Sequence, residues 1–181
     1  MSRFIRSVPA LGLALAMSLA GATAIQAEEL KVGDKAPDFS LQGTDGKTYS
    51  LDQFKGKKAI VIAWFPKADT QGCTIECKSL KENGAALKPL NVAYFTASVD
   101  VPEDNKKFAE KLELDYPILS DPTKSVAQAY GVINPARGFA NRWTYYIDKE
   151  GTIKEIDKKI TTKTAGQDVA AKVKSLGLSS K

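Results

Sequence analysis

Apolar residues along this chain are grouped in two ways, in short runs typical of buried strands and in longer stretches with the spacing of helices. Residues 58–65 are rich in Ile, Val and aromatic side chains with little alternation, as in a central strand buried on both faces. The same criteria predict strands at residues 91–100, 116–119, 142–148 and 152–157, and helices at residues 70–87, 102–112, 120–130 and 165–176. Because strands and helices alternate, the sequence predicts a layered α/β fold with helices on both faces of a central mixed sheet.

Turn-forming residues separate these segments. Asp45-Gly46 lies between two short alternating segments and predicts an N-terminal β-hairpin. Residues 51–54 are interpreted as a single turn of helix. Gly131 is expected to cap the helix that precedes it, and residues 149–151 to form the tight turn between the last two strands.

The N-terminal residues have the composition of a leader. Two arginines precede an apolar stretch at residues 8–24, and small residues follow up to Ala27. This pattern predicts a secretory signal peptide at residues 1–27, with Ala24 as the alternative cleavage site and an uncleaved anchor as the alternative interpretation. The remainder, residues 28–181, is long enough for a single domain, which we expect to be exported to the periplasm.

Charge and composition exclude several classes of function. The net charge is +5, but the lysines are scattered among acidic residues, so we expect no nucleic-acid partner and no stable membrane association after cleavage. The chain contains no histidine, which excludes Ser-His-Asp and Cys-His catalysis and the usual zinc sites. Two cysteines alone make a poor metal site, so we expect no metal.

Both cysteines, Cys73 and Cys77, follow the predicted central strand. Cys73 stands at the start of a predicted helix, where unpaired N–H groups and the positive end of the helix dipole favour the reactive thiolate. A structural disulfide is one interpretation, although residues i and i+4 of a helix hold their Cβ atoms about 5–6 Å apart and a disulfide needs about 3.8 Å. Inert core cysteines are a second interpretation, which the turn-like residues before Cys73 disfavour. Redox chemistry, with Cys73 as nucleophile, is the third and the favoured one.

These residues carry a resemblance to a known family. Pro66-x-x-x-Thr70-x-x-Cys73 resembles the active-site signature of the peroxiredoxins (AhpC/TSA-like), and the longer run from Phe65 to Glu76 resembles their bacterioferritin-comigratory, or Q-type, branch. Further similarity lies at residues 33–39, 119–122 and 142–153, so that nearly the whole mature chain is covered.

The resemblance implies a thioredoxin-like fold and thiol-dependent reduction of peroxides, without a metal, flavin or haem. It implies that Cys73 is the peroxidatic thiolate, which attacks a peroxide oxygen and becomes a sulfenic acid. The hydroxyl of Thr70 is expected to bond to the thiolate and the peroxide, and Pro66 to shield the sulfur from water. Arg142 is expected to stabilise the thiolate and the departing oxygen, with Glu76 orienting an arginine.

The chain departs from the branch at two positions. Gln71 stands where the branch usually has Pro. Cys77 lies four residues after Cys73, whereas a resolving cysteine in this helix usually lies five residues on. If Cys77 resolves, the first helical turns must unwind; if it does not, an external thiol must act. Arg137 is the alternative candidate for the cation at the site.

Two other classes of function remain open for this sequence. A thioredoxin-like disulfide exchanger is the alternative enzyme, although it normally carries Cys-x-x-Cys, and a scaffold with a spent site is a third class. The expected partners are a peroxide and a thioredoxin-like or other thiol reductant, and the expected state is a monomer. Phe139, Trp143 and Trp64 are candidates either for an apolar entrance or for the core.

Overall fold

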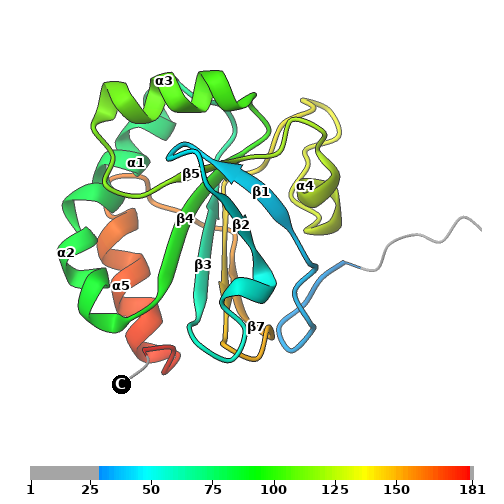
Figure 1. The fold of residues 1–181 in the computed structure, drawn as a ribbon, viewed down its shortest axis with the longest axis vertical. Coiled ribbons are helices and arrows are strands. Elements are labelled where there is room, and N and C mark those ends of the chain that lie inside the picture. Colours follow the sequence, from blue (N-terminus) through cyan, green and yellow to red (C-terminus); the bar gives the residue numbers. More distant parts are fainter. Residues whose placement is uncertain (1–28, 180–181) are drawn as a thin grey trace, which may run out of the picture.

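The computed structural model describes residues 29–179, so the predicted signal peptide and its cleavage site lie outside the described residues. The described chain forms a seven-stranded sheet in the order β2-β1-β5-β4-β3-β6-β7, with helices packed against it (Figure 1). The strands are β1 (Ser40–Gly43), β2 (Thr48–Ser50), β3 (Ile60–Trp64), β4 (Ala93–Ser98), β5 (Ile118–Ser120), β6 (Trp143–Ile147) and β7 (Ile153–Asp157). The helices are α1 (Gln71–Glu82), α2 (Gly84–Leu87), α3 (Pro102–Leu112), α4 (Ser125–Ala129) and α5 (Ala165–Ser175), with 3₁₀ turns at η1 (Leu51–Gln53) and η2 (Lys88–Leu90).

The sheet is mixed, as the alternation of elements predicts. β3 lies near its centre, parallel to β4 and antiparallel to β6, with Trp64 opposite both Ala97 and Trp143. β1 pairs antiparallel with β2 and with β5, and β7 pairs antiparallel with β6. The predicted N-terminal hairpin is confirmed by the β1–β2 pair, in which Gly46 has the positive φ of 80° that such a turn requires.

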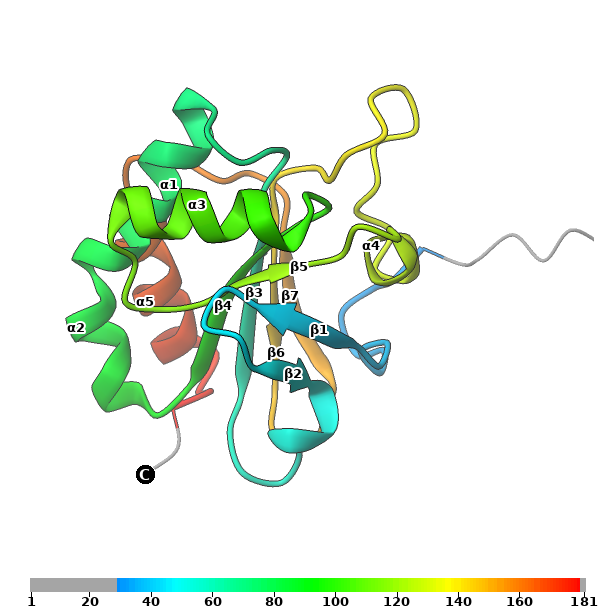
Figure 2. The same cartoon turned by 45° about the horizontal axis from the view of Figure 1, so that its top comes forward.

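Alternate residues of β3 face opposite sides of the sheet, so both faces are buried. Ile60, Ile62 and Trp64 belong to a cluster with residues of β1, of α4 and of the segment before β1. Val61 and Ala63 belong to a second cluster, which α1 and α5 cover. The predicted helices on both faces are therefore confirmed, with α1 and α5 on one side and α4 on the other (Figures 1 and 2).

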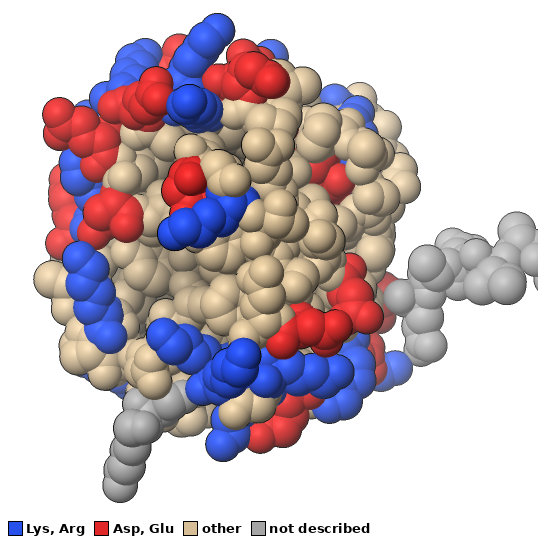
Figure 3. Space-filling view, viewed as in Figure 1, with Lys and Arg blue, Asp and Glu red and all other residues tan. Residues whose placement is uncertain are grey.

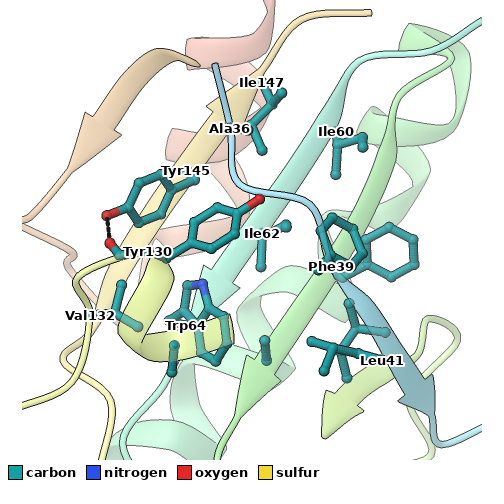
Figure 4. Packing of buried hydrophobic residues seen from close by; sticks show 14 of the residues in the cluster. Ala36, Phe39, Leu41, Ile60, Ile62, Trp64, Tyr130, Val132, Tyr145 and Ile147 are labelled. Atoms are coloured by element: carbon teal, nitrogen blue, oxygen red, sulfur yellow. Dashed lines mark hydrogen bonds between the residues drawn. The ribbon is translucent and has the colours of Figure 1, made fainter. Parts of the chain in front are cut away.

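The larger core cluster is built around aromatic rings (Figure 4). The ring centroid of Tyr130 lies 6.3 Å from that of Trp64 and 5.1 Å from that of Tyr145. The hydroxyl of Tyr145 donates to the carbonyl of Tyr130 at 2.5 Å. Trp64 is fully buried in this cluster, which assigns it to the core and not to a substrate entrance.

Helix α1 is fastened to α5 at one point of close approach. The hydroxyl of Ser79 donates to the carbonyl of Lys163 at 3.0 Å and accepts the N–H of Gly166 at 3.1 Å. A Cβ at Gly166 would lie 2.2 Å from the carbonyl oxygen of Ser79, so only glycine fits there. The second half of α1 is therefore fixed against the C-terminal helix.

The predicted helix at residues 70–87 is interrupted at Asn83, which was not expected. The side-chain amide of Asn83 donates to the carbonyl of Ser79 at 2.8 Å. Such bonds from asparagine to the backbone compete with continued helix. As a result, α1 ends at Glu82 and the short α2 follows as a separate element.

Two elements after β4 begin at least two residues later than predicted, whereas α3 and α5 begin where predicted. β5 begins at Ile118, just after Pro117, which has no N–H for a ladder hydrogen bond. α4 begins only at Ser125, because the residues before it form a turn. In that turn Asp121 accepts a backbone N–H of α4 at 2.7 Å, and Lys124 has a left-handed φ of 62°.

The surface carries charges of both signs. On the face in Figure 3, lysines and arginines alternate with acidic residues around the rim, and the centre holds few charges. Along the lower part of this face several basic side chains lie side by side, with acidic residues next to them. Within residues 29–179, none of the helices has the length and apolar character needed to cross a bilayer.

Candidate active site

Three chain segments meet at one edge of the sheet, beside the first turn of α1. Residues 65–70 leave the carboxyl end of β3 there. Because β4 is parallel to β3, its own carboxyl end and Asp100 reach the same edge. Because β6 is antiparallel to β3, it begins at this edge, which brings Arg142 beside the loop. The amino end of α1 and the segment leading into β6 rise on the same side of the molecule in Figure 2.

The loop before α1 is held by β4 and α3. The N–H of Phe65 donates to the carbonyl of Ala97 at 2.9 Å, and the N–H of Ala68 donates to the carboxylate of Asp100 at 2.8 Å. Asp69 has a left-handed φ of 59°, and its carboxylate pairs with Lys111 of α3 at 2.6 Å. These contacts fix the direction in which α1 starts, and hence the position of the first thiol.

The guanidinium of Arg142 joins the two acidic groups of the first helical turns. Its Nη2 donates to the sulfur of Cys73 at 3.3 Å, and its Nη1 pairs with Oε2 of Glu76. The two partners are three residues apart in α1 and so lie on one face of the helix. A Cβ at Gly72 would lie 3.2 Å from Nη2, so glycine leaves room for the guanidinium at this approach.

Burial makes these charges interact strongly. The side chain of Glu76 is 1% exposed and that of Arg142 is 22% exposed. Burial raises the pKa of Glu76 to about 7, although neighbouring Arg142 opposes the rise. Burial alone would lower the pKa of Arg142, but Glu76 and Cys73 raise it above its ordinary value. The cation is therefore permanent, whereas the carboxyl exchanges its proton near neutral pH.

The second thiol, Cys77, is buried in an apolar cluster with Phe65, Phe108 and Ile118. The hydroxyl of Tyr116 donates to the carbonyl of Cys77 at 3.0 Å. Burial, together with the charge of Glu76, raises the pKa of the Cys77 thiol above its ordinary value. In the folded protein this thiol is therefore protonated and enclosed. Both cysteines are free.

The structure brings together three of the predicted site residues, Cys73, Glu76 and Arg142. The prediction that Glu76 orients an arginine agrees with its ion pair to Arg142. Arg137, the alternative cation, lies in an exposed turn between α4 and β6. Pro66 is half-buried at the start of the loop that follows β3.

Two expectations about the site differ from the structure. Thr70 is exposed, and its hydroxyl donates to the carbonyl of Lys67 at 3.1 Å instead of to the sulfur. Cys73 is fully buried, so the expectation that its turn-like surroundings keep it out of the core is wrong. The reason is packing from distant segments, because Phe108 and Leu112 of α3 cover the same cluster.

Three further residues shape the site and were not predicted to do so. Asp100 holds the loop, Tyr116 binds the turn that carries the second cysteine, and Gly72 admits the guanidinium. Only Gly72 had a signal in the sequence, as the residue directly before Cys73 in the run that resembles the Q-type branch. The other two depend on the pairing of strands and on the packing of α3, which local pattern does not reveal.

Comparison with known proteins shows the family to which the chain belongs. Residues 32–156 match the AhpC/TSA family, and the chain belongs to this family. The putative peroxiredoxin bcp of Haemophilus influenzae is 33% identical over 153 residues, covering 81% of this chain and 98% of that protein. Peroxiredoxin Bcp of Escherichia coli is 35% identical over 133 residues, covering 70% of this chain and 85% of that protein.

Solved structures give the same assignment. Peroxidoxin BcpB of Mycobacterium tuberculosis is similar with a TM-score of 0.74 at 25% identity, over 81% of this chain and 97% of that chain. A cysteine-to-serine variant of PrxQ from Xylella fastidiosa has a TM-score of 0.75 at 18% identity, over 82% and 98% of the two chains, which supports the fold. The predicted thioredoxin-like peroxiredoxin fold is confirmed. The protein is a thiol-dependent peroxidase with relatives of the Bcp type.

Substitution of Glu76 by Gln should change how stability depends on pH. Because the carboxyl pKa is raised to about 7 in the folded protein, the folded state binds the proton more tightly than the unfolded chain. The wild type therefore loses stability as pH rises from about 4.5 towards 7, and Glu76→Gln does not. The advantage of the variant should grow by about 3 kcal/mol across this window.

Urea unfolding of the reduced proteins at several pH values measures this difference. Glu82→Gln is the matched control, because Glu82 is an exposed residue of the same helix. Parallel stability curves for the wild type and Glu76→Gln between pH 4.5 and 7 would contradict the assignment of a raised pKa to Glu76.

Proposed function

We propose that Cys73 is the nucleophile of this peroxidase. Its thiolate attacks the terminal oxygen of a hydroperoxide, an S–O bond forms and the O–O bond breaks. The departing hydroxide or alkoxide takes up a proton, and the cysteine is left as a sulfenic acid. The observation that carries this proposal is the guanidinium nitrogen of Arg142, 3.3 Å from the sulfur.

Arg142 has two tasks in this proposal. It stabilises the thiolate before reaction, and it offers a fixed positive charge to the oxygen that departs with the electron pair. Such preorganised charges act strongly in a site that excludes water. The amino end of α1 adds unpaired N–H groups beside Cys73, which favour negative charge for the same reason.

Thr70 and Pro66 act on the substrate side. Thr70 caps α1 with its backbone, and its exposed hydroxyl turns from the Lys67 carbonyl towards the peroxide when substrate binds. Pro66, half-buried, limits the access of water to the sulfur. Because Cys73 is fully buried in this structure, the side chains over the sulfur must separate for a peroxide to enter.

Cys77 is proposed to resolve the sulfenic acid. Its thiol displaces the hydroxyl of the sulfenic acid, which leaves as water, and an S–S bond forms. In the folded helix the two residues are one turn apart and Cys77 is enclosed, so the first turn of α1 must unwind. A disulfide closed in this way is strained, and strained disulfides are easily reduced.

We also propose where the enzyme acts, what reduces it and in which oligomeric state it acts. Export rests on the signal-peptide pattern of residues 1–27, and it places the enzyme in the periplasm. There a thioredoxin-like partner that receives its electrons across the membrane is the fitting reductant. We propose that the mature enzyme acts as a monomer.

Replacing Arg142 by Ala should slow the oxidation of reduced protein by hydrogen peroxide about 100- to 1,000-fold, since that is the usual effect of removing one preorganised charge partner. Stopped-flow fluorescence measures the rate. Cys73→Ser should abolish the reaction. Arg137→Ala is the matched control and should leave the rate unchanged, because Arg137 lies in an exposed turn.

Arg142→Ala also leaves Glu76 buried without its ion-pair partner, which can destabilise the protein by about 3–5 kcal/mol. The comparison is therefore repeated in the Glu76→Gln background, where no buried charge remains unpaired. Oxidation as fast in Arg142→Ala as in Arg137→Ala, in both backgrounds, would remove Arg142 from the mechanism.

The intact mass after one equivalent of peroxide tests the role of Cys77. If Cys77 resolves, the oxidised wild type is lighter than the reduced protein by two hydrogen atoms, and Cys77→Ser is heavier by one oxygen atom. A wild type that retains the extra oxygen until an external thiol is added would show that Cys77 does not resolve.

The mass of the chain from a fractionated Gram-negative host tests export. We expect a protein that begins at Glu28 in the periplasmic fraction, with the product of cleavage after Ala24, which begins at Ile25, as a minor species at most. Full-length chain confined to the cytoplasm or to the membrane would contradict the proposed location.

A further inference from the structure

One oxygen of the buried carboxylate lacks a donor. Oε2 of Glu76 pairs with Arg142, but Oε1 is buried and has no hydrogen-bond partner among the described residues. The side chain is 1% exposed, so bulk water does not reach this oxygen. A buried acceptor without a partner costs about 1–3 kcal/mol, and more when it is charged. The ionised form of Glu76 therefore needs a donor that the protein itself does not supply.

A small cavity lies at Glu76, bordered by α1, β3, β6, α5 and the residues after β7. Cys73 and Arg142 do not line it. Its volume, counted as the space open to the centre of a water molecule, is about 10 Å³. One water needs about 10–15 Å³ by the same measure and two to four polar partners. The cavity therefore has the size for a single water.

The walls of the cavity are partly polar, which distinguishes it from the apolar voids that stay dry. Thr144 of β6 contributes a buried hydroxyl-bearing side chain. Asp157, Lys159 and Asp168 also line the cavity, and Lys159 and Asp168 are exposed at the surface. A water in the cavity thus has polar neighbours at Glu76 and Thr144, and exposed residues at Lys159 and Asp168.

We propose that this cavity holds one internal water that donates a hydrogen bond to Oε1 of Glu76. We further infer that Glu76 exchanges its proton with solvent through this water, beside Lys159 and Asp168, and not through the side where peroxide meets Cys73. The water site concerns the resting protein and does not depend on the proposed role of Cys73. Its effect on the sulfur does rest on that role.

Glu76 has charged and titratable neighbours on two sides, and its protonation changes how Arg142 is shared. Arg142 and Cys73 face it on the substrate side, Cys77 follows it in α1, and Tyr116 approaches from the segment before β5. The cavity side contributes the remaining groups: Tyr146, Asp157, Lys159 and Asp168. When Glu76 is ionised, its charge competes with the thiolate for the guanidinium. When it is protonated, Arg142 serves the sulfur alone.

The pKa of Glu76, raised by burial to about 7, agrees with an exchange near neutral pH. The water opposes this rise, because its hydrogen bond favours the ionised carboxylate. Displacing the water should therefore increase the proton affinity of Glu76 further. The direction of this change in pKa is what the experiment tests.

Ala165→Val adds two methyl groups to a side chain that lines the cavity, and so displaces the water. The carboxyl ¹³C signal of Glu76, assigned by its loss in Glu76→Gln, is titrated in the reduced protein. We expect its proton affinity to rise about tenfold or more, the equivalent of losing one hydrogen bond to a charged group. Ala170→Val is the matched control, because Ala170 is a buried residue of the same helix that does not line the cavity.

Thr144→Val is the second variant, because it keeps the volume of the side chain but removes a polar neighbour of the water. It should shift the titration of Glu76 in the same direction.

A crystal structure of the wild type should show one water within hydrogen-bond distance of Oε1 of Glu76. A dry cavity, or equal titration midpoints in Ala165→Val and Ala170→Val, would overturn the proposal. If the midpoint shifts but the pH profile of peroxide oxidation does not, the water site stands and the role given to Cys73 and Arg142 fails.

Discussion

The ion pair between Arg142 and Glu76, with the sulfur of Cys73 as a third partner, is the contact on which the site depends. It joins the start of β6 to the first turns of α1. Taking two charges out of water costs several kcal/mol per ion, so the pair persists only because its geometry and its extra hydrogen bond are good. The ion pair also fixes the rotation of α1 about its axis, because Cys73 and Glu76 must both face the guanidinium of Arg142.

Much of the fold could be predicted from the sequence, because its local signals agree with its packing. The continuous apolar run of β3, the Asp45-Gly46 turn and the proline that opens α3 each specify an element where the structure has it. The break at Asn83 and the late start of α4 escaped prediction. Both depend on side-chain hydrogen bonds to the backbone, which periodicity does not contain.

The sequence identified the residues of the site, but not the burial of Cys73 or the hydrogen bond of Thr70. The motif and the late arginine indicated Cys73, Glu76 and Arg142, and the antiparallel register of β3 and β6 explains why they meet. The burial of Cys73 could not be foreseen, since Phe108 and Leu112 come from a helix more than thirty residues away. The hydroxyl of Thr70 donates to the carbonyl of Lys67, and this local bond depends on the conformation of the loop, which the motif does not specify.

The two halves of α1 are held in different ways, because only the second half contains the close contact at Ser79 with the start of α5. In the second half, Ser79 accepts the N–H of Gly166, at a distance where no side chain fits on residue 166. In the middle of the helix, the hydroxyl of Tyr116 donates to the carbonyl of Cys77. The first half is held instead by Arg142, through Cys73 and Glu76, and by the loop before the helix. A rearrangement of the first turn of α1 therefore leaves the second half of the helix packed in place, so that local unfolding stays confined to one end of this element.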